Sequence, residues 1–171
     1  MYFPDLGTTC QIARGPRVRA VGWLADGHDF SQGPLDERVA SKAMRLAEDG
    51  WVHAAVAGFH TCELCADARE GRNILVPDAD VLYVAPAMIV HYMRAHAYAP
   101  PPAFCSAVLA CPEPETDAYY AALRRFVDVF SSGVVAMTAE QFDHYAREHR
   151  AWRAQIKASR IAAAERKGFT W

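Results

Sequence analysis

Two cysteines and three histidines near the middle of the chain have the types and spacing of metal ligands. Cys62 and Cys65 form a C-x-x-C motif, and His60 precedes this motif by two positions. His91 and His96 follow further along the chain. Thiolates and imidazoles are the ligands that zinc prefers, and it holds them in a tetrahedron. The pattern therefore predicts a zinc site, with zinc as the cofactor.

The spacing also favours one choice among the candidate ligands. In an extended chain His60 and Cys62 point to the same side, so both can reach one ion. His91 and His96 are five positions apart, which separates them by roughly 140° around a helix. One ion cannot easily take both unless the last turn of that helix is distorted. We therefore predict the ligand set His60, Cys62, Cys65 and His91, with His96 as the alternative fourth ligand.

Other interpretations of the same residues stay open. Cys62 and Cys65 could be two buried free thiols, because cysteine is commonly buried as a small apolar residue. A redox or metal-sensing pair is a further alternative. Redox C-x-x-C motifs usually lie at a helix N-terminus, whereas here His60 precedes the motif. Cys105 could also enter the site, but the apolar residues around it favour the core of a short helix.

Whether the metal would be structural or catalytic depends on its coordination. Glu63 lies between the two cysteines and could carry a proton, although acidic side chains are mostly exposed to solvent. The deaminase and H-E-x-x-H motifs are absent from the sequence. Four protein ligands would indicate a zinc-stabilised binding or regulatory protein. An open coordination position would instead indicate a zinc-dependent hydrolase or lyase, with Glu63 or His96 as proton carrier.

The elements that must position these residues alternate between strands and helices. Strand-like runs cover residues 18–24, 51–57, 74–76 and 81–84, and the last two are joined by a turn. A helix is expected before Gly50, and a second one carries His91 and His96 until a run of prolines stops it. The sequence thus predicts an α+β fold. Its small, mostly antiparallel sheet carries a zinc knuckle under covering helices, and a C-terminal helical hairpin follows.

The C-terminal part differs in composition, and we expect two domains, at 1–112 and 113–171. Thr116 can cap one helix, and Thr138 with Gln141 has the form of a capping box for a second. On the second helix, apolar side chains alternate three and four positions apart, as on a helix that packs against another helix. This helix is expected to contact a protein partner, a second copy of the chain or the body of its own chain. The seam consists of Phe142, Tyr145, His149, Trp152 and Ile156.

Composition excludes several classes of protein. The net charge of −2 over 171 residues argues against a nucleic-acid-binding function, since such proteins are usually basic. No apolar run is long enough to span a bilayer, so no membrane association is expected. Residues 1–5 lack the features of a signal peptide. The odd number of cysteines does not suggest a disulfide framework, and a cytoplasmic location is expected.

Several sequence blocks resemble an uncharacterised family of short bacterial proteins. The resemblance covers residues 1–109 and is strongest at the cysteine and histidine block. It implies that the blocks together form one site, and it implies no particular activity. The blocks are Tyr2-Phe3-Pro4-Asp5-Leu6, Val21-Gly22-Trp23-Leu24, Gly58-Phe59-His60-Thr61-Cys62-Glu63-Leu64-Cys65 and the stretch from His91-Tyr92 to His96-Ala97-Tyr98 with Pro100 and Pro101.

Overall fold

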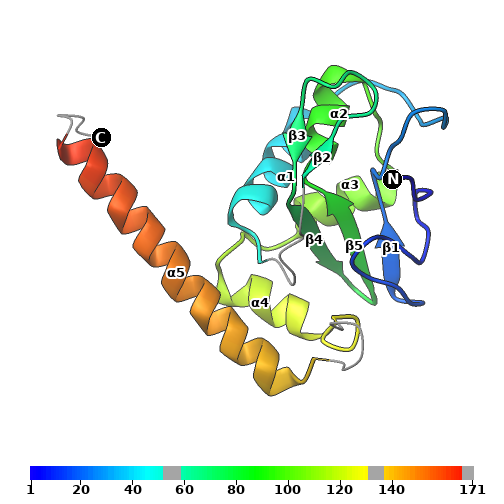
Figure 1. The fold of residues 1–171 in the computed structure, drawn as a ribbon. Helices are drawn as coiled ribbons and strands as arrows, with labels where there is room; N and C mark the ends of the chain where they lie inside the picture. Colours follow the sequence, from blue (N-terminus) through cyan, green and yellow to red (C-terminus); the bar gives the residue numbers. More distant parts are fainter. Residues whose placement is uncertain (52–58, 131–136, 167–171) are drawn as a thin grey trace.

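A computed structural model describes residues 1–51, 59–130 and 137–166, with only the backbone given for 164 and 165. The described chain has the predicted α+β fold, shown in Figure 1. A three-stranded sheet has the order β1-β5-β4, and β2 pairs with β3 in a separate antiparallel ribbon. The strands are β1 (Val18–Ala20), β2 (His60–Thr61), β3 (Arg69–Glu70), β4 (Asn73–Asp78) and β5 (Val81–Pro86).

The main part of the sheet is the hairpin of β4 and β5, in which β5 is the central strand. The two strands pair antiparallel from Asn73 opposite Pro86 to Asp78 opposite Val81. Both are almost continuously apolar, as is expected for strands covered on both faces. The edge strand β1 pairs with β5 in parallel, which makes the sheet mixed but mostly antiparallel.

Three helices cover the body of the protein. Helix α1 (Glu37–Asp49) begins at Asp36, whose carboxylate accepts the backbone N–H of Arg38, and ends before Gly50 as expected. Its apolar side packs on β4, α2 and α3. Helix α2 (Ile89–Ala95) follows β5 directly and carries His91, while α3 (Pro102–Ala110) begins within the proline run. No helix among the described ranges combines the length and apolar character needed to cross a bilayer.

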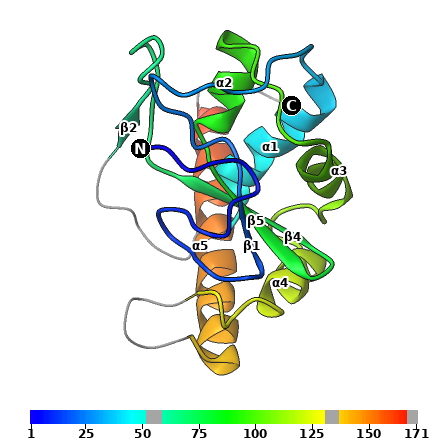
Figure 2. The same ribbon diagram turned by 90° about the vertical axis from the view of Figure 1, so that its right-hand side faces the viewer.

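The C-terminal hairpin consists of α4 (Asp117–Arg124) and the much longer α5 (Ala139–Arg166), which lie side by side in Figures 1 and 2. Thr116 Oγ1 accepts the N–H of Tyr119 at 3.2 Å, as predicted for a cap. Thr138 and Gln141 exchange two hydrogen bonds of 2.8 and 3.2 Å, so the predicted capping box is confirmed.

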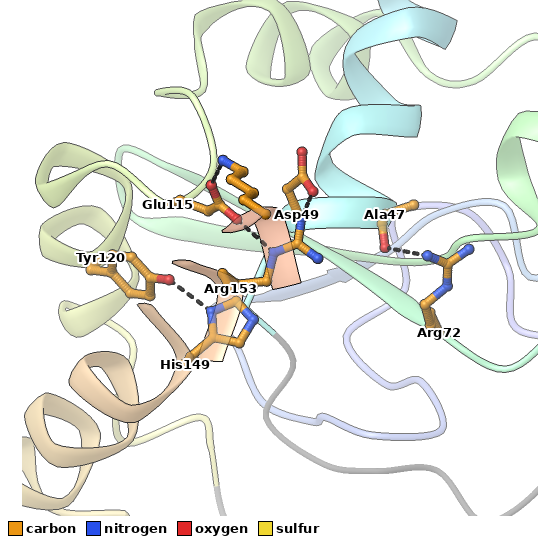
Figure 3. A network of polar contacts seen from close by, with 8 residues as sticks. Ala47, Asp49, Arg72, Glu115, Tyr120, His149 and Arg153 are labelled. Carbon is orange, nitrogen blue, oxygen red and sulfur yellow. Dashed lines mark hydrogen bonds and ion pairs between the residues drawn. The ribbon is translucent and has the colours of Figure 1, made fainter. Parts of the chain in front are cut away.

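Polar contacts fasten the middle of α5 to the body, as Figure 3 shows. Arg153 is only 6% exposed and forms ion pairs with Asp49 and Glu115. The hydroxyl of Tyr120 lies 2.7 Å from Nδ1 of His149. The packing side of α5 is therefore partly polar.

The predicted apolar seam of α5 is only partly covered. Phe142 is buried, whereas Tyr145 and Trp152 are 50% and 53% exposed. The strand predicted at 51–57 lies outside the described residues apart from Trp51, and the two-domain division stays a prediction.

Candidate metal centre

Four side chains from two distant segments meet in one group: Cys62, Cys65, His91 and His96. Their ligand atoms all lie within 4.8 Å of one another. Nε2 of His96 is 3.4 Å from Sγ of Cys62, and Nε2 of His91 is 3.3 Å from Sγ of Cys65. The two Nε2 atoms are 3.1 Å apart. Around a tetrahedral zinc, sulfur and nitrogen ligands lie about 3.5 Å apart and two nitrogens about 3.3 Å apart. The group can therefore hold a metal ion.

The two cysteines are presented by a tight turn that starts where β2 ends. The N–H of Ala66 donates to the carbonyl of Cys62 at 2.8 Å, and the N–H of Cys62 donates to the carbonyl of Ala68 at 2.9 Å. The N–H of Asp67 points at Sγ of Cys65, 3.4 Å away. Ala66 has a positive φ of 62°, which lets the chain fold back after Cys65. This turn places both sulfurs in the group.

The two histidines come together because α2 ends between them. The helix stops at Ala95, and His96 has non-helical angles of φ −121° and ψ 9°. Ala97 follows in the left-handed region with a φ of 52°. The N–H groups of His96 and Tyr98 both donate to the carbonyl of Tyr92, at 3.0 and 3.1 Å. This distorted end brings two rings together that a regular helix would hold roughly 140° apart.

His60 is the one residue of the predicted set that the structure does not bring to the group. Its Nε2 lies 3.0 Å from Oε1 of Gln11, and its ring packs edge-on against Trp23. β2 ends at Thr61, one residue before Cys62, so His60 and Cys62 do not share one regular strand as the extended-chain argument assumed. His96, the alternative fourth ligand, lies in the group instead. Cys105 also lies outside the group, with its thiol 3.6 Å from the carbonyl of Pro100.

Glu63, the candidate proton carrier, is engaged elsewhere. Its carboxylate is about half exposed, accepts the amino group of Met1 at 2.7 Å and accepts the N–H of Asp26 at 3.3 Å. The amino group is the main reason that the pKa of Glu63 lies below its ordinary value. These contacts hold an ionised carboxylate toward the N-terminal segment.

Burial and charge differ among the four residues of the group. Cys62 is only 1% exposed, while the other three side chains are half-buried. Burial, followed by the proximity of His96, lowers the pKa of His91 and favours the neutral imidazole that metals bind. The amide of Asp67 lowers the pKa of Cys65, but burial and the neighbouring Cys62 outweigh it and raise the pKa overall.

Asp5 is a supporting residue that the sequence argument did not assign. Its Oδ1 accepts the N–H of Gly22 and its Oδ2 accepts the hydroxyl of Tyr98, both at 2.8 Å. Asp5 thereby connects three of the sequence blocks, and it fixes the chain just after His96. Its place in the first of these blocks was the only signal in the sequence.

The fold and the site together define a small α+β protein with a two-cysteine, two-histidine group that could hold a metal ion. The chain belongs to the family described as domain of unknown function DUF7919, whose model matches residues 1–109. The match to an uncharacterised family agrees with the resemblance seen in the sequence, and it spans the whole group. Comparisons with curated proteins and with solved structures found no match.

Proposed function

We propose that this is a small zinc-binding protein in which Cys62, Cys65, His91 and His96 hold one mainly structural ion. The observation that carries the proposal is the convergence of four ligand atoms, from a turn and from the end of α2, within 4.8 Å. Such an ion would cross-link the turn to the helix and stabilise the fold.

The donor set supports zinc and a closed site. Thiolate and imidazole donors suit zinc and disfavour magnesium and calcium, which prefer oxygen ligands. Four protein donors complete a tetrahedron and leave no position for a substrate or water. The hydrolase or lyase alternative needs a proton carrier, and in this proposal Glu63 is engaged with Met1 while His96 is a ligand. The five free cysteines are compatible with the reducing cytoplasm, which stays part of the proposal.

Elemental analysis of the untagged protein tests this proposal. We expect about one zinc per chain in the purified protein. Cys62→Ser and His96→Ala should lose the metal, whereas His60→Ala should keep it, since His60 is bonded to Gln11 outside the group. Absence of bound metal after incubation with excess zinc would refute the proposal. Loss of metal in His60→Ala with full metal in His96→Ala would refute the ligand set.

We further propose that the protein acts as a binding or regulatory module and contacts another polypeptide through α5. Tyr145, Trp152 and Ile161 are each at least half exposed on this helix. Lys157 pairs with Glu115, and the C-terminal end of α5 runs away from the body in Figure 1. An isolated helical end is marginal in water, and exposed aromatic residues are enriched at interfaces.

Sedimentation measurements test this contact and distinguish a second copy of the chain from a different protein partner. A dimer that dissociates in Trp152→Glu would indicate a second copy of the chain. A monomer that binds another protein, with binding lost in Trp152→Glu, would indicate a different partner. If neither occurs, α5 has no such role.

A further inference from the structure

A hollow of about 340 Å³ lies at the N-terminal segment, and none of its lining residues belongs to the cysteine and histidine group. Three aromatic side chains line it, together with two acidic ones. Its volume is at the lower end of the range for small-molecule sites. The two acids are Asp5 and Asp29, and the aromatic residues are Tyr2, Phe3 and Phe30.

The lining carries negative charge without a cationic partner among the residues described. Both oxygens of Asp5 are bonded, but their donors are neutral: the N–H of Gly22 and the hydroxyl of Tyr98. Asp29 is exposed and has no hydrogen bond or ion pair within the described part of the chain. No lysine, arginine or histidine belongs to the described lining. The hollow therefore favours a positively charged ligand.

The aromatic rings are held in place by neighbours outside the hollow. Phe3 packs edge-on against Trp23 at 5.5 Å, and Phe30 packs against Tyr98 at 6.2 Å between ring centroids. Tyr2 stacks on His28 at 3.8 Å with nearly parallel rings. Aromatic faces attract cations because of their quadrupole, and rings that are already positioned need little reordering on binding.

We propose that this hollow binds an organic ammonium group, a positively charged nitrogen that carries apolar alkyl substituents. The alkyl part would contact the rings while the charge faces Asp29. A small hard cation such as Mg²⁺ or Ca²⁺ fits poorly, because it requires several oxygen ligands and both oxygens of Asp5 already accept hydrogen bonds. The ammonium group could belong to a free amine or to a lysine side chain. The proposal does not depend on the metal centre.

Titration of the full chain by ¹H–¹⁵N NMR tests the proposal. The probes are choline, its uncharged isostere 3,3-dimethylbutan-1-ol, and Nα-acetyl-lysine methylamide as a lysine side chain in a peptide setting. We expect shifts at the amides of residues 29–31, with choline or the lysine derivative binding at least about tenfold more tightly than the alcohol. The tighter of the two cationic probes identifies the source of the ammonium group.

Matched variants show whether binding of the cationic probes depends on the charge of Asp29 and on the ring of Phe30. Asp29→Asn and Phe30→Ala should each weaken binding roughly three- to tenfold. Asp80→Asn removes the same charge from a fully exposed side chain that does not line the hollow, and it should leave binding unchanged. Equal affinity for the charged and uncharged probes, or equal binding by Asp29→Asn and the native chain, would overturn the proposal. So would an absence of shifts with all three probes.

Discussion

Gly22 lies directly against the side chain of Ile89, the first residue of α2. A Cβ atom at Gly22 would stand 2.8 Å from both Cγ1 and Cδ1 of Ile89, closer than such atoms approach. Gly22 also has a φ of +70°, which disfavours any other residue. This contact packs the start of α2 against the segment at Gly22, and α2 carries His91.

Gly22→Ala should therefore destabilise the protein by roughly 2–4 kcal/mol, from backbone strain together with overpacking. Gly27→Ala is the matched control, because Gly27 has a similar φ of +77° but open space around its Cα. It should cost only about 1 kcal/mol. Urea denaturation measures both values. Equal losses would mean that the contact with Ile89 has no energetic role.

The hydrogen bond between Tyr98 and Asp5 should contribute measurably to stability. Tyr98 is 2% exposed, and its hydroxyl donates to a carboxylate. Tyr98→Phe keeps the ring but removes the donor, so we expect a loss of about 1.5–3 kcal/mol. In Tyr145→Phe the affected hydroxyl belongs to a half-exposed residue, and denaturation should show almost no change. If the free energy of unfolding were unchanged in Tyr98→Phe, Asp5 would not need the hydrogen bond from Tyr98.

Metal removal should lower the melting temperature. A ligand that binds only the folded state at a thousand times its Kd contributes about 4 kcal/mol, which corresponds to about 10 °C for a chain of this size. A strong chelator should therefore produce this decrease in the native protein and in His60→Ala. The melting temperature of Cys65→Ser should already be low and should not respond to the chelator. Calorimetric scans with and without chelator provide the comparison.

Two arginines of α5 should differ sharply in their effect on stability. Arg153 is buried between Asp49 and Glu115, and its removal leaves the partly buried Asp49 without its counter-charge and Glu115 with Lys157 alone. Arg153→Ala should cost about 3 kcal/mol. Arg150 pairs with the exposed Asp117 and lies over the ring of Tyr120, so Arg150→Ala should cost less than about 1 kcal/mol. Similar losses in denaturation experiments would contradict the assigned anchoring role of Arg153.

His149 should make stability depend on pH. Burial lowers its pKa from the ordinary value of 6.5, and nearby Glu115 only partly offsets this. The unfolded chain therefore binds a proton at this site more readily than the folded one. The stabilisation is present above about pH 6.5 and is lost as the pH falls toward the depressed value. Burial raises the pKa of Tyr120 to about 12, so its hydroxyl remains a donor throughout this range.

Unfolding free energies measured between about pH 7 and pH 5 should fall by at most about 1.4 kcal/mol per pH unit from this residue. His149→Gln keeps an acceptor for the hydroxyl of Tyr120 and should show a shallower decrease. Because both proteins contain the same metal-centre histidines, the difference between the two slopes isolates His149. Identical slopes would exclude it as the titrating group.

Local features of this fold could be predicted from the sequence because they depend on residues close in the chain. The cap at Thr116 and the capping box of Thr138 and Gln141 each involve partners three positions apart. Two apolar runs joined by a turn were enough to predict the hairpin of β4 and β5. Parallel pairing of β1 with β5 joins residues that are far apart in sequence, and no local pattern indicated it.

The choice between His60 and His96 illustrates the limit of this reasoning. It depends on where β2 and α2 end, and long-range contacts determine the end of α2. The N–H of Gly33 donates to the carbonyl of Ala97, and the N–H of Ala99 donates to the carbonyl of Ser31, both at 2.9 Å. Together with Asp5 and Tyr98, these bonds turn the chain away from the helix axis directly after His96.

The uneven burial of the four candidate ligands has a kinetic consequence. Cys62 lies beneath the surface, while Cys65, His91 and His96 face outward in part. Among the described residues, these three give the group its exposed side, from which a competing chelator would reach a bound ion. Departure of the ion would then proceed in sequence, with the outer ligands exchanged first and the thiolate of Cys62 released last. The fraction of the protein that holds metal would then depend on the competing metal-binding molecules that reach these exposed ligands, as well as on the equilibrium affinity of the site.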